Sequence, residues 1–341
     1  INPKPNSIFK TMAVSIADIQ KLRKMTGAGL SDCKKALTET EGNFDKAVEI
    51  IREKGQAIAA KRSDRETSNG CVLVKYADNF GAIVALKCET DFVANGADYI
   101  KLTQDILDAA VAAKAKSLDE VKELTLADGT KVLDAVVARS GITGEKMELD
   151  GYNFIEGENI STYDHMSKHT LCTMVQTNKP AEEQAHAIAM QVAAMKPMFL
   201  DEASVSQEFI EEEKKVAAEK TKQELVQKAV EAALKKAGIN PAHVDSEEHM
   251  ESNMGKGWIT AEDVAKAKEI IATVSAEKAA NLPAQMIENI VKGRINRIYK
   301  ENCLLNQEFI QDSKLSVADY LKAADKDLTV VDYKRFSLSA D

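Results

Sequence analysis

The sequence predicts an α+β protein of several domains, and three observations lead to this prediction. Apolar residues recur at helical spacing through residues 14–55. From residue 70 the period changes to short apolar runs separated by turn residues, as in antiparallel strands. Residues 208–238 are rich in Ala, Glu and Lys, which indicates a long charged helix. A chain of 341 residues has room for two or three such parts.

Composition and charge exclude several classes of protein. The 44% hydrophobic and 29% charged residues are ordinary for a globular chain, and no apolar run approaches the ~20 residues of a membrane span. A formal net charge of −9 argues against a phosphate-binding surface, and 5% aromatic residues argue against a platform for stacking bases. Five scattered cysteines fit a reducing compartment better than a disulfide framework. We therefore expect a cytoplasmic protein that binds neither membranes nor nucleic acids directly.

The N-terminal part is predicted to be a compact helical bundle. Residues 1–12 precede the first periodic segment and lack the apolar run of a signal peptide, so we expect a disordered extension. Residues 13–56 contain three short helical patterns, which open at the capping residues Ser15, Ser31 and Asn43. The size and helix rhythm of this bundle resemble those of ubiquitin-associated (UBA) domains. The polar, charged residues 57–69 are expected to be a linker.

Residues 70–143 are expected to form the N-subdomain of the core. The apolar runs 71–77 and 81–89 are separated by Asp-Asn-Phe-Gly, which predicts an antiparallel hairpin. An amphipathic helix over 97–116 and a shorter helix over 130–139 follow.

A C-subdomain of the same kind is expected from residues 144–201 together with 283–310. Its strands are predicted to pair as a β-meander, followed by a helix over 180–195. The three strands of this meander are 145–155, 158–165 and 169–177. Both subdomains share the order of strand, turn, strand and helix, so we interpret the core as two similar α+β halves with antiparallel sheets.

Residues 202–282 are expected to be a long helical hairpin of coiled-coil character, inserted into the C-subdomain. Two long charged helices are separated by a Gly and an Asn-Pro pair, which stop helices, and Thr260 with Asp263 is expected to cap the second. A short helix near 316–324 and a strand near 328–338 predict a small C-terminal module over residues 311–341.

The motifs of common catalytic and nucleotide-binding sites are absent from the sequence. It has no GxxxxGK[ST] or GxGxxG loop and no CxxC or HExxH pattern. A turn between His165 and His169 places them on neighbouring strands, which disfavours a metal pair. Cys88 has no His nearby in the sequence and is interpreted as a buried structural thiol. We therefore expect no cofactor, no metal and no covalent or acid–base catalysis.

One short segment, CETDFVANG over residues 88–96, joins a predicted strand to a predicted helix. Considered locally, Asp91 is a helix N-cap and Phe92 is its packing neighbour. The same segment is also part of a wider resemblance, which gives Phe92 a different interpretation.

Several ordered segments resemble bacterial translation elongation factor Ts, the guanine-nucleotide exchange factor of elongation factor Tu. They are LRKMTGAGLSDCKKAL (22–37), ETDFVAN (89–95), the Tyr163-x-His165 pair, AMQVAAMKPMFL (189–200) and IVKGRINRIYKENCLLNQEFI (290–310). The resemblance covers about residues 13–200 and 283–338. This chain departs from the family at Leu30–Ser31, where two apolar residues are common, and at residues 202–282, which exceed the short coiled-coil protrusion of the family.

The resemblance implies that the chain binds elongation factor Tu in its GDP-bound and nucleotide-free forms. The implied mechanism is GDP release by disturbance of the Mg²⁺/phosphate site, and the factor then stays bound until GTP binds. The segment implied to dislodge Mg²⁺ consists of Thr90, Asp91, Phe92 and Val93. In this interpretation Phe92 points outward into the partner, and Asp91 orients the segment by hydrogen bonding.

The resemblance also implies further contacts with elongation factor Tu, at Arg23, Gly29, Leu30 and His165. Leu30 has an equally weighted alternative as a core residue at a helix corner. His165 has an equally weighted alternative as a turn histidine in a local hydrogen bond.

Two other classes of function stay open at this stage. The chain is alternatively a UBA-type protein-binding adaptor without exchange activity, or a thiol- or metal-dependent enzyme. Self-association through residues 202–282 is also left open, because such protrusions serve it in some members of the family.

Overall fold

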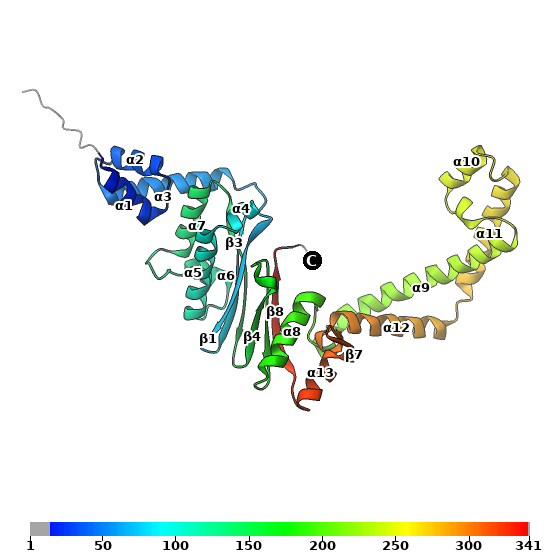
Figure 1. Cartoon of the computed structure of the whole chain (residues 1–341). Coiled ribbons are helices and arrows are strands. Elements are labelled where there is room, and N and C mark those ends of the chain that lie inside the picture. The colour runs from blue at the N-terminus through cyan, green and yellow to red at the C-terminus, as the bar shows by residue number, and fades with distance from the viewer. Residues whose placement is uncertain (1–13, 340–341) are drawn as a thin grey trace, which may run out of the picture. The chain divides into compact units, whose positions relative to one another are not determined.

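The computed structural model describes residues 14–339 and confirms a mixed protein of α-helices and antiparallel sheets (Figure 1). The extension expected at residues 1–12 lies outside the described residues. The chain divides into two compact units, Ile1–Lys196 with Phe309–Asp341, and Pro197–Glu308. Over the described residues, no helix has both the length and the apolar character that a membrane crossing requires.

The first unit begins with the three predicted helices, α1 (Ile16–Thr26), α2 (Leu30–Glu39) and α3 (Phe44–Lys61). Ser15 and Asn43 cap α1 and α3 as predicted, since their side chains accept backbone N–H groups. Gly29, and not Ser31, is the N-cap of α2. The helices share a small apolar core that includes Leu22, Leu37 and Ala47.

Helix α3 extends into the predicted linker and packs against α7 (Val132–Thr143). Two glycines make this close crossing possible. A Cβ on Gly141 would lie 2.6 Å from the Cα of Gly55, and a Cβ on Gly55 would lie 3.2 Å from the carbonyl oxygen of Val137. The C-terminal part of α3 therefore packs closely on α7.

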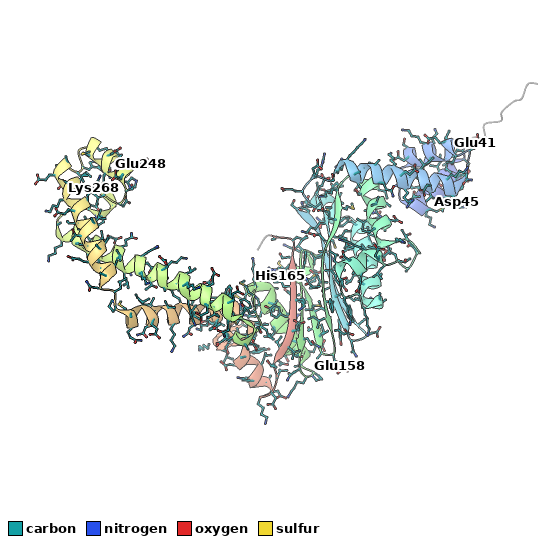
Figure 2. The ribbon with its side chains drawn as sticks, turned by 180° about the vertical axis from the view of Figure 1, so that it is seen from behind. Glu41, Asp45, Glu158, His165, Glu248 and Lys268 are labelled. Carbon is teal, nitrogen blue, oxygen red and sulfur yellow. The ribbon has the colours of Figure 1, made fainter. Side chains whose placement is uncertain are left out.

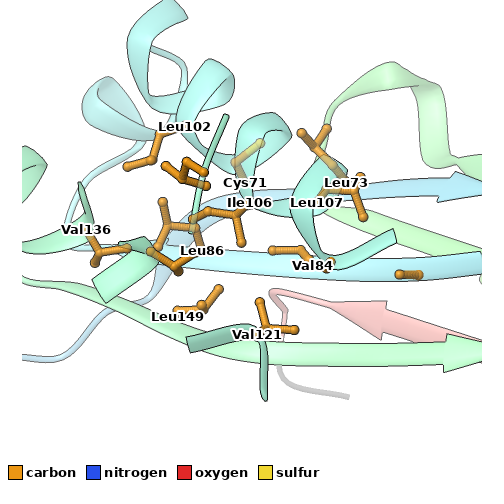
Figure 3. Close-up of a cluster of buried hydrophobic side chains, with 14 of the residues drawn as sticks. Cys71, Leu73, Val84, Leu86, Leu102, Ile106, Leu107, Val121, Val136 and Leu149 are labelled. Atoms are coloured by element: carbon orange, nitrogen blue, oxygen red, sulfur yellow. The ribbon is translucent and has the colours of Figure 1, made fainter. Parts of the chain in front are cut away.

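The first sheet contains β1 (Asn69–Ala77), β2 (Phe80–Cys88) and β3 (Met147–Glu156), in that order and antiparallel. Helices α5 (Ala97–Ala113), α6 (Leu118–Glu123) and α7 cover one face of this sheet (Figure 1). The core between sheet and helices includes Leu86, Ile106 and Leu107, which are fully buried (Figure 3). This apolar layer fixes the end of β2, from which the candidate site begins.

The second sheet has the order β4 (Ile160–Asp164), β5 (Leu171–Thr177) and β8 (Val330–Ser337). The predicted pairing of the strands 158–165 and 169–177 is confirmed, because β4 and β5 are antiparallel neighbours. The first strand of the predicted β-meander is wrong, because β3 pairs with β2 of the first sheet, and β8 is the third strand of the second sheet. Gly157, with φ 144°, lies in the turn where the chain passes from one sheet to the other, so Glu156–Gly157 is not a hairpin turn.

The two sheets pack face to face through a shared apolar cluster. Val72 and Ile83 of the first sheet contact Cys172 and Met174 of the second in this cluster. Helix α8 (Glu182–Met195) covers the outer face of the second sheet (Figure 1). The predicted short helix and strand near the C-terminus are confirmed as α13 (Val317–Ala324) and β8. A two-stranded sheet of β6 (Glu308–Phe309) and β7 (Asp312–Ser316) precedes α13.

The second unit is helical. Helices α11 (Ala261–Ala280) and α12 (Ala284–Asn302) both pack against α9 (Gln207–Lys236). The predicted capping box of Thr260 and Asp263 is present at the start of α11. The region between α9 and α11 contains a further helix, α10 (Glu247–Gly255), and a small core in which Val244 and Met250 are buried.

Candidate protein-binding site

The segment after β2 forms a single helical turn, α4 (Asp91–Ala94), at one end of the first sheet (Figure 1). Its N-cap is Thr90, whose hydroxyl oxygen accepts the Val93 N–H at 3.4 Å. The local prediction of Asp91 as the cap is therefore wrong, since Asp91 is the first helical residue. The Asp91 carboxylate makes no hydrogen bond or ion pair with another residue of the described range 14–339. It is exposed and available to a partner.

Glu145, which follows α7, fixes Thr90 in place. The Thr90 N–H donates to one carboxylate oxygen at 3.1 Å, and the Thr90 hydroxyl donates to the other at 2.6 Å. At the other end of the turn, Asn95 donates its backbone and side-chain N–H groups to the Asp91 carbonyl oxygen. Both ends of α4 are thus hydrogen-bonded, which limits the motion of the segment.

Phe92 projects from this turn into solvent, with 86% of its surface exposed. On the opposite side Ala94 is buried in the core of the first unit, and Val93 packs partly against the same core. The predicted outward orientation of Phe92 is confirmed, whereas its contact with a partner stays a prediction. An exposed Phe forgoes about 1.5–3 kcal/mol of burial free energy, so its exposure on a fixed turn favours a binding role.

A charge cluster around Glu89, which the sequence analysis did not predict, lies at the base of α4. Arg62 and Arg65 donate to the two Glu89 carboxylate oxygens at 3.1 and 2.8 Å, and the Lys146 N–H donates at 2.7 Å. The Lys146 N–H and the two guanidinium groups lower the pKa of Glu89 from its ordinary 4.5 to about 2. This carboxylate therefore connects the end of α3, the end of β2 and the start of β3.

Cys88, next to this cluster, is a buried structural thiol as predicted. Its Sγ contacts the carbonyl oxygen of Thr90 at 3.2 Å, and burial raises the pKa of its thiol to about 11. A thiol with such a pKa is almost wholly protonated at neutral pH and is a weak nucleophile. Among the residues that the structure describes, no group of three or more His, Cys, Asp or Glu is placed to hold a metal ion.

His165 lies in the turn between β4 and β5, at the opposite end of β4 from Glu158 (Figure 2). It is half-buried, with its Nδ1 3.1 Å from the Tyr163 hydroxyl and the two rings edge to face. The alternative of a local hydrogen bond is therefore confirmed for His165, and its role in partner binding stays a prediction. The neighbouring Met166, which the sequence did not single out, is 66% exposed.

The two turns border the same hollow at one end of the sandwich. This hollow has a volume of about 250 Å³. Asp91 and Asn95 line one side, and Lys168 and His169 line the other. Two segments more than 70 positions apart in the sequence are thus adjacent in the first unit.

The predicted contacts of the N-terminal bundle lie at the corner between α1 and α2. Arg23 and Gly29 are exposed, and Leu30 is 49% exposed, which contradicts the alternative of Leu30 as a core residue. Met25, in the last turn of α1, adds exposed apolar surface near the same corner. The binding role of this corner stays a prediction.

Comparison with known proteins gives one consistent result. The sequence profile of the family described as Elongation factor TS matches residues 89–240 and 227–340. Proteins named Elongation factor Ts from Bacteroides fragilis and Bacteroides thetaiotaomicron are 68% and 66% identical to this chain over 331 residues, which is 97% of the chain and 100% of each relative. The Elongation factor Ts of Porphyromonas gingivalis is 43% identical with the same coverage. Since 97% of the chain is matched, most of the segment 202–282 has a counterpart in these relatives.

Proposed function

We propose that this chain, which belongs to the elongation factor Ts family, is a guanine-nucleotide exchange factor for elongation factor Tu. The single observation that best supports this function is the exposure of Phe92 on a turn that is held at both ends. The family resemblance predicts a wedge at this position, and the side chain is oriented as a wedge requires.

The proposed mechanism needs no covalent or acid–base step. A G protein holds GDP through its phosphate loop and a Mg²⁺ ion that bridges protein and phosphate oxygens. Mg²⁺ demands a near-ideal octahedral shell, so a small displacement of its ligands weakens both metal and nucleotide. A factor that binds the displaced form more tightly lowers the affinity for GDP, and by linkage GDP lowers the affinity for the factor by the same ratio.

Phe92 supplies part of the binding free energy that such a displacement requires. Burial of one Phe contributes about 1.5–3 kcal/mol, which corresponds to roughly tenfold to a hundredfold in affinity. This amount drives a local displacement but does not account for the whole exchange reaction. We assign the remainder to the other predicted contacts, which are Thr90, Asp91, Val93, Arg23, Gly29, Leu30 and His165.

The held geometry of α4 increases the effect of Phe92. A flexible segment loses conformational freedom when it binds, whereas a segment that is already fixed loses little. The Thr90–Glu145 hydrogen bonds and the packing of Ala94 fix α4 before the partner arrives. We therefore propose that the free energy of Phe92 burial goes mainly into displacing groups of the partner.

Stopped-flow release of a fluorescent GDP analogue from elongation factor Tu tests this function. The wild-type chain is expected to accelerate release strongly, and Phe92→Ala to reduce the acceleration at subsaturating factor by roughly tenfold to a hundredfold. Trp258→Ala is the matched control, because Trp258 is an aromatic residue of the second unit that is 60% exposed. Failure of the wild-type chain to accelerate release would refute the proposed function.

A further inference from the structure

We propose that Met166 is a second apolar contact for the partner protein and that the Asp164–His169 pair holds it in position. The inference rests on the proposed function, because it assigns a further contact to the same binding surface. It concerns the turn between β4 and β5, in which only His165 was implied as a contact.

Met166 has a large apolar side chain that is mostly exposed to solvent. It is 66% exposed, and its neighbours Ser167 and Lys168 are exposed polar residues. A Met side chain adapts its shape to an irregular partner surface, which makes it effective at binding sites. Its apolar surface is therefore available to another protein.

The backbone of this turn is strained. Met166 and Ser167 have φ angles of 55° and 51°, in the left-handed region that few residues other than Gly, Asn, Asp and His adopt. Such a conformation persists only where surrounding contacts impose it. The turn must therefore be held by specific interactions.

Asp164 supplies these interactions through His169. One Asp164 carboxylate oxygen accepts the His169 backbone N–H at 3.1 Å, and the other is hydrogen-bonded to His169 Nδ1. The His169 carbonyl oxygen accepts the Val72 N–H at 2.7 Å, which ties the turn to β1 of the facing sheet. The Lys168 N–H donates to the His165 carbonyl oxygen and closes the loop that carries Met166.

The position of this turn matches the surface proposed for Phe92. His169 and Lys168 line the hollow of about 250 Å³ whose other side is formed by Asp91 and Asn95 of the Phe92 turn. A partner that buries Phe92 at this end of the sandwich therefore also meets the β4–β5 turn. The two exposed apolar side chains belong to one binding surface.

The contact is tested with Met166→Ala in a titration of nucleotide-free elongation factor Tu. We expect the Kd to rise about five- to tenfold, because most of one exposed apolar side chain is removed. Met198→Ala is the matched control, since Met198 is 62% exposed and lies in the second unit. An unchanged Kd for Met166→Ala, with wild-type binding intact, would overturn the inference while leaving the proposed function in place.

The positioning role is tested with a double-mutant cycle. His169→Ala is expected to weaken binding about as much as Met166→Ala, and the double variant to be no weaker than either single one, because His169 acts through Met166. His169→Asn should restore binding, since Asn tolerates a positive φ and keeps a side-chain N–H donor. Additive losses of binding free energy in the double variant would contradict the positioning role. So would a loss of binding by His169→Ala that is fully explained by a lower unfolding temperature. Absence of wild-type binding would refute this inference and the proposed function together.

Discussion

Replacement of Glu145 by Ala should loosen the Phe92 turn without unfolding the protein. The change removes the acceptor of two Thr90 hydrogen bonds, at 3.1 and 2.6 Å. A hydrogen bond to a charged group contributes about 1.5–3 kcal/mol. Thr90 is exposed and Glu145 is half-buried, so water reaches both bonds, and we expect a loss of about 1–2 kcal/mol for the two together. The packing of Ala94 and Val93 is unchanged, so the lost free energy affects mainly how well α4 is ordered.

A partner must restore that order when it binds Glu145→Ala, so the lost free energy should appear as weaker binding. We expect about five- to thirtyfold less acceleration of GDP release at subsaturating factor. Backbone hydrogen exchange at residues 91–96 should rise, while the thermal midpoint changes little. Glu156→Ala is the control, because it removes a similar carboxylate whose exposed ion pair with Lys116 lies at the far end of β3. Unchanged release kinetics combined with faster exchange at α4 would refute the argument that a fixed turn matters.

Two further predictions concern stability. The ionised Glu89 carboxylate stabilises the folded state, as its lowered pKa indicates. This contribution to the free energy of unfolding, at most about 3 kcal/mol, is complete above pH 4.5 and is lost as the pH falls towards 2. Urea unfolding of Glu89→Gln should therefore show a weaker dependence on pH between 5 and 2 than wild type, and an equal dependence would contradict the assignment. Gly141→Ala should lower the free energy of unfolding by about 1–3 kcal/mol, because its Cβ would lie 2.6 Å from the Cα of Gly55. Gly293→Ala is the control, because Gly293 lies in α12 with no atom within 4 Å of the added Cβ, and it should raise the free energy of unfolding by up to about 1 kcal/mol. Equal effects of the two substitutions would contradict the argument that α3 and α7 need glycines where they cross.

Local signals in the sequence predicted several helix starts correctly, although Gly29 and Thr90, and not Ser31 and Asp91, cap α2 and α4. Ser15, Asn43 and the Thr260–Asp263 capping box begin helices as expected, because each cap depends on residues no more than three positions apart. The local hairpin pairings of β1 with β2 and of β4 with β5 were also predicted correctly. Long-range pairing was not, because β8, the second partner of β5, lies more than 150 residues further along the chain.

The features of the candidate site were also predicted only in part. The outward orientation of Phe92 followed from the family resemblance, whereas local reasoning had made Asp91 a cap. The residues that hold the site were missed because their partners are distant, with Glu145 55 positions from Thr90 and Lys146 57 positions from Glu89. Helix α10 was missed because its buried residues, such as Met250, are sparse in a polar segment.

The most direct test of the central claim compares GDP release from elongation factor Tu by wild type and Phe92→Ala, with Mg²⁺ present and with Mg²⁺ chelated. If Phe92 acts by disturbing the Mg²⁺/phosphate site, the wild type should be faster by roughly tenfold to a hundredfold with Mg²⁺ present. The difference in the rate of GDP release between wild type and Phe92→Ala should be smaller when Mg²⁺ has already been chelated. Equal acceleration by the two proteins in Mg²⁺, with both correctly folded, would contradict the assignment of Phe92 as the wedge.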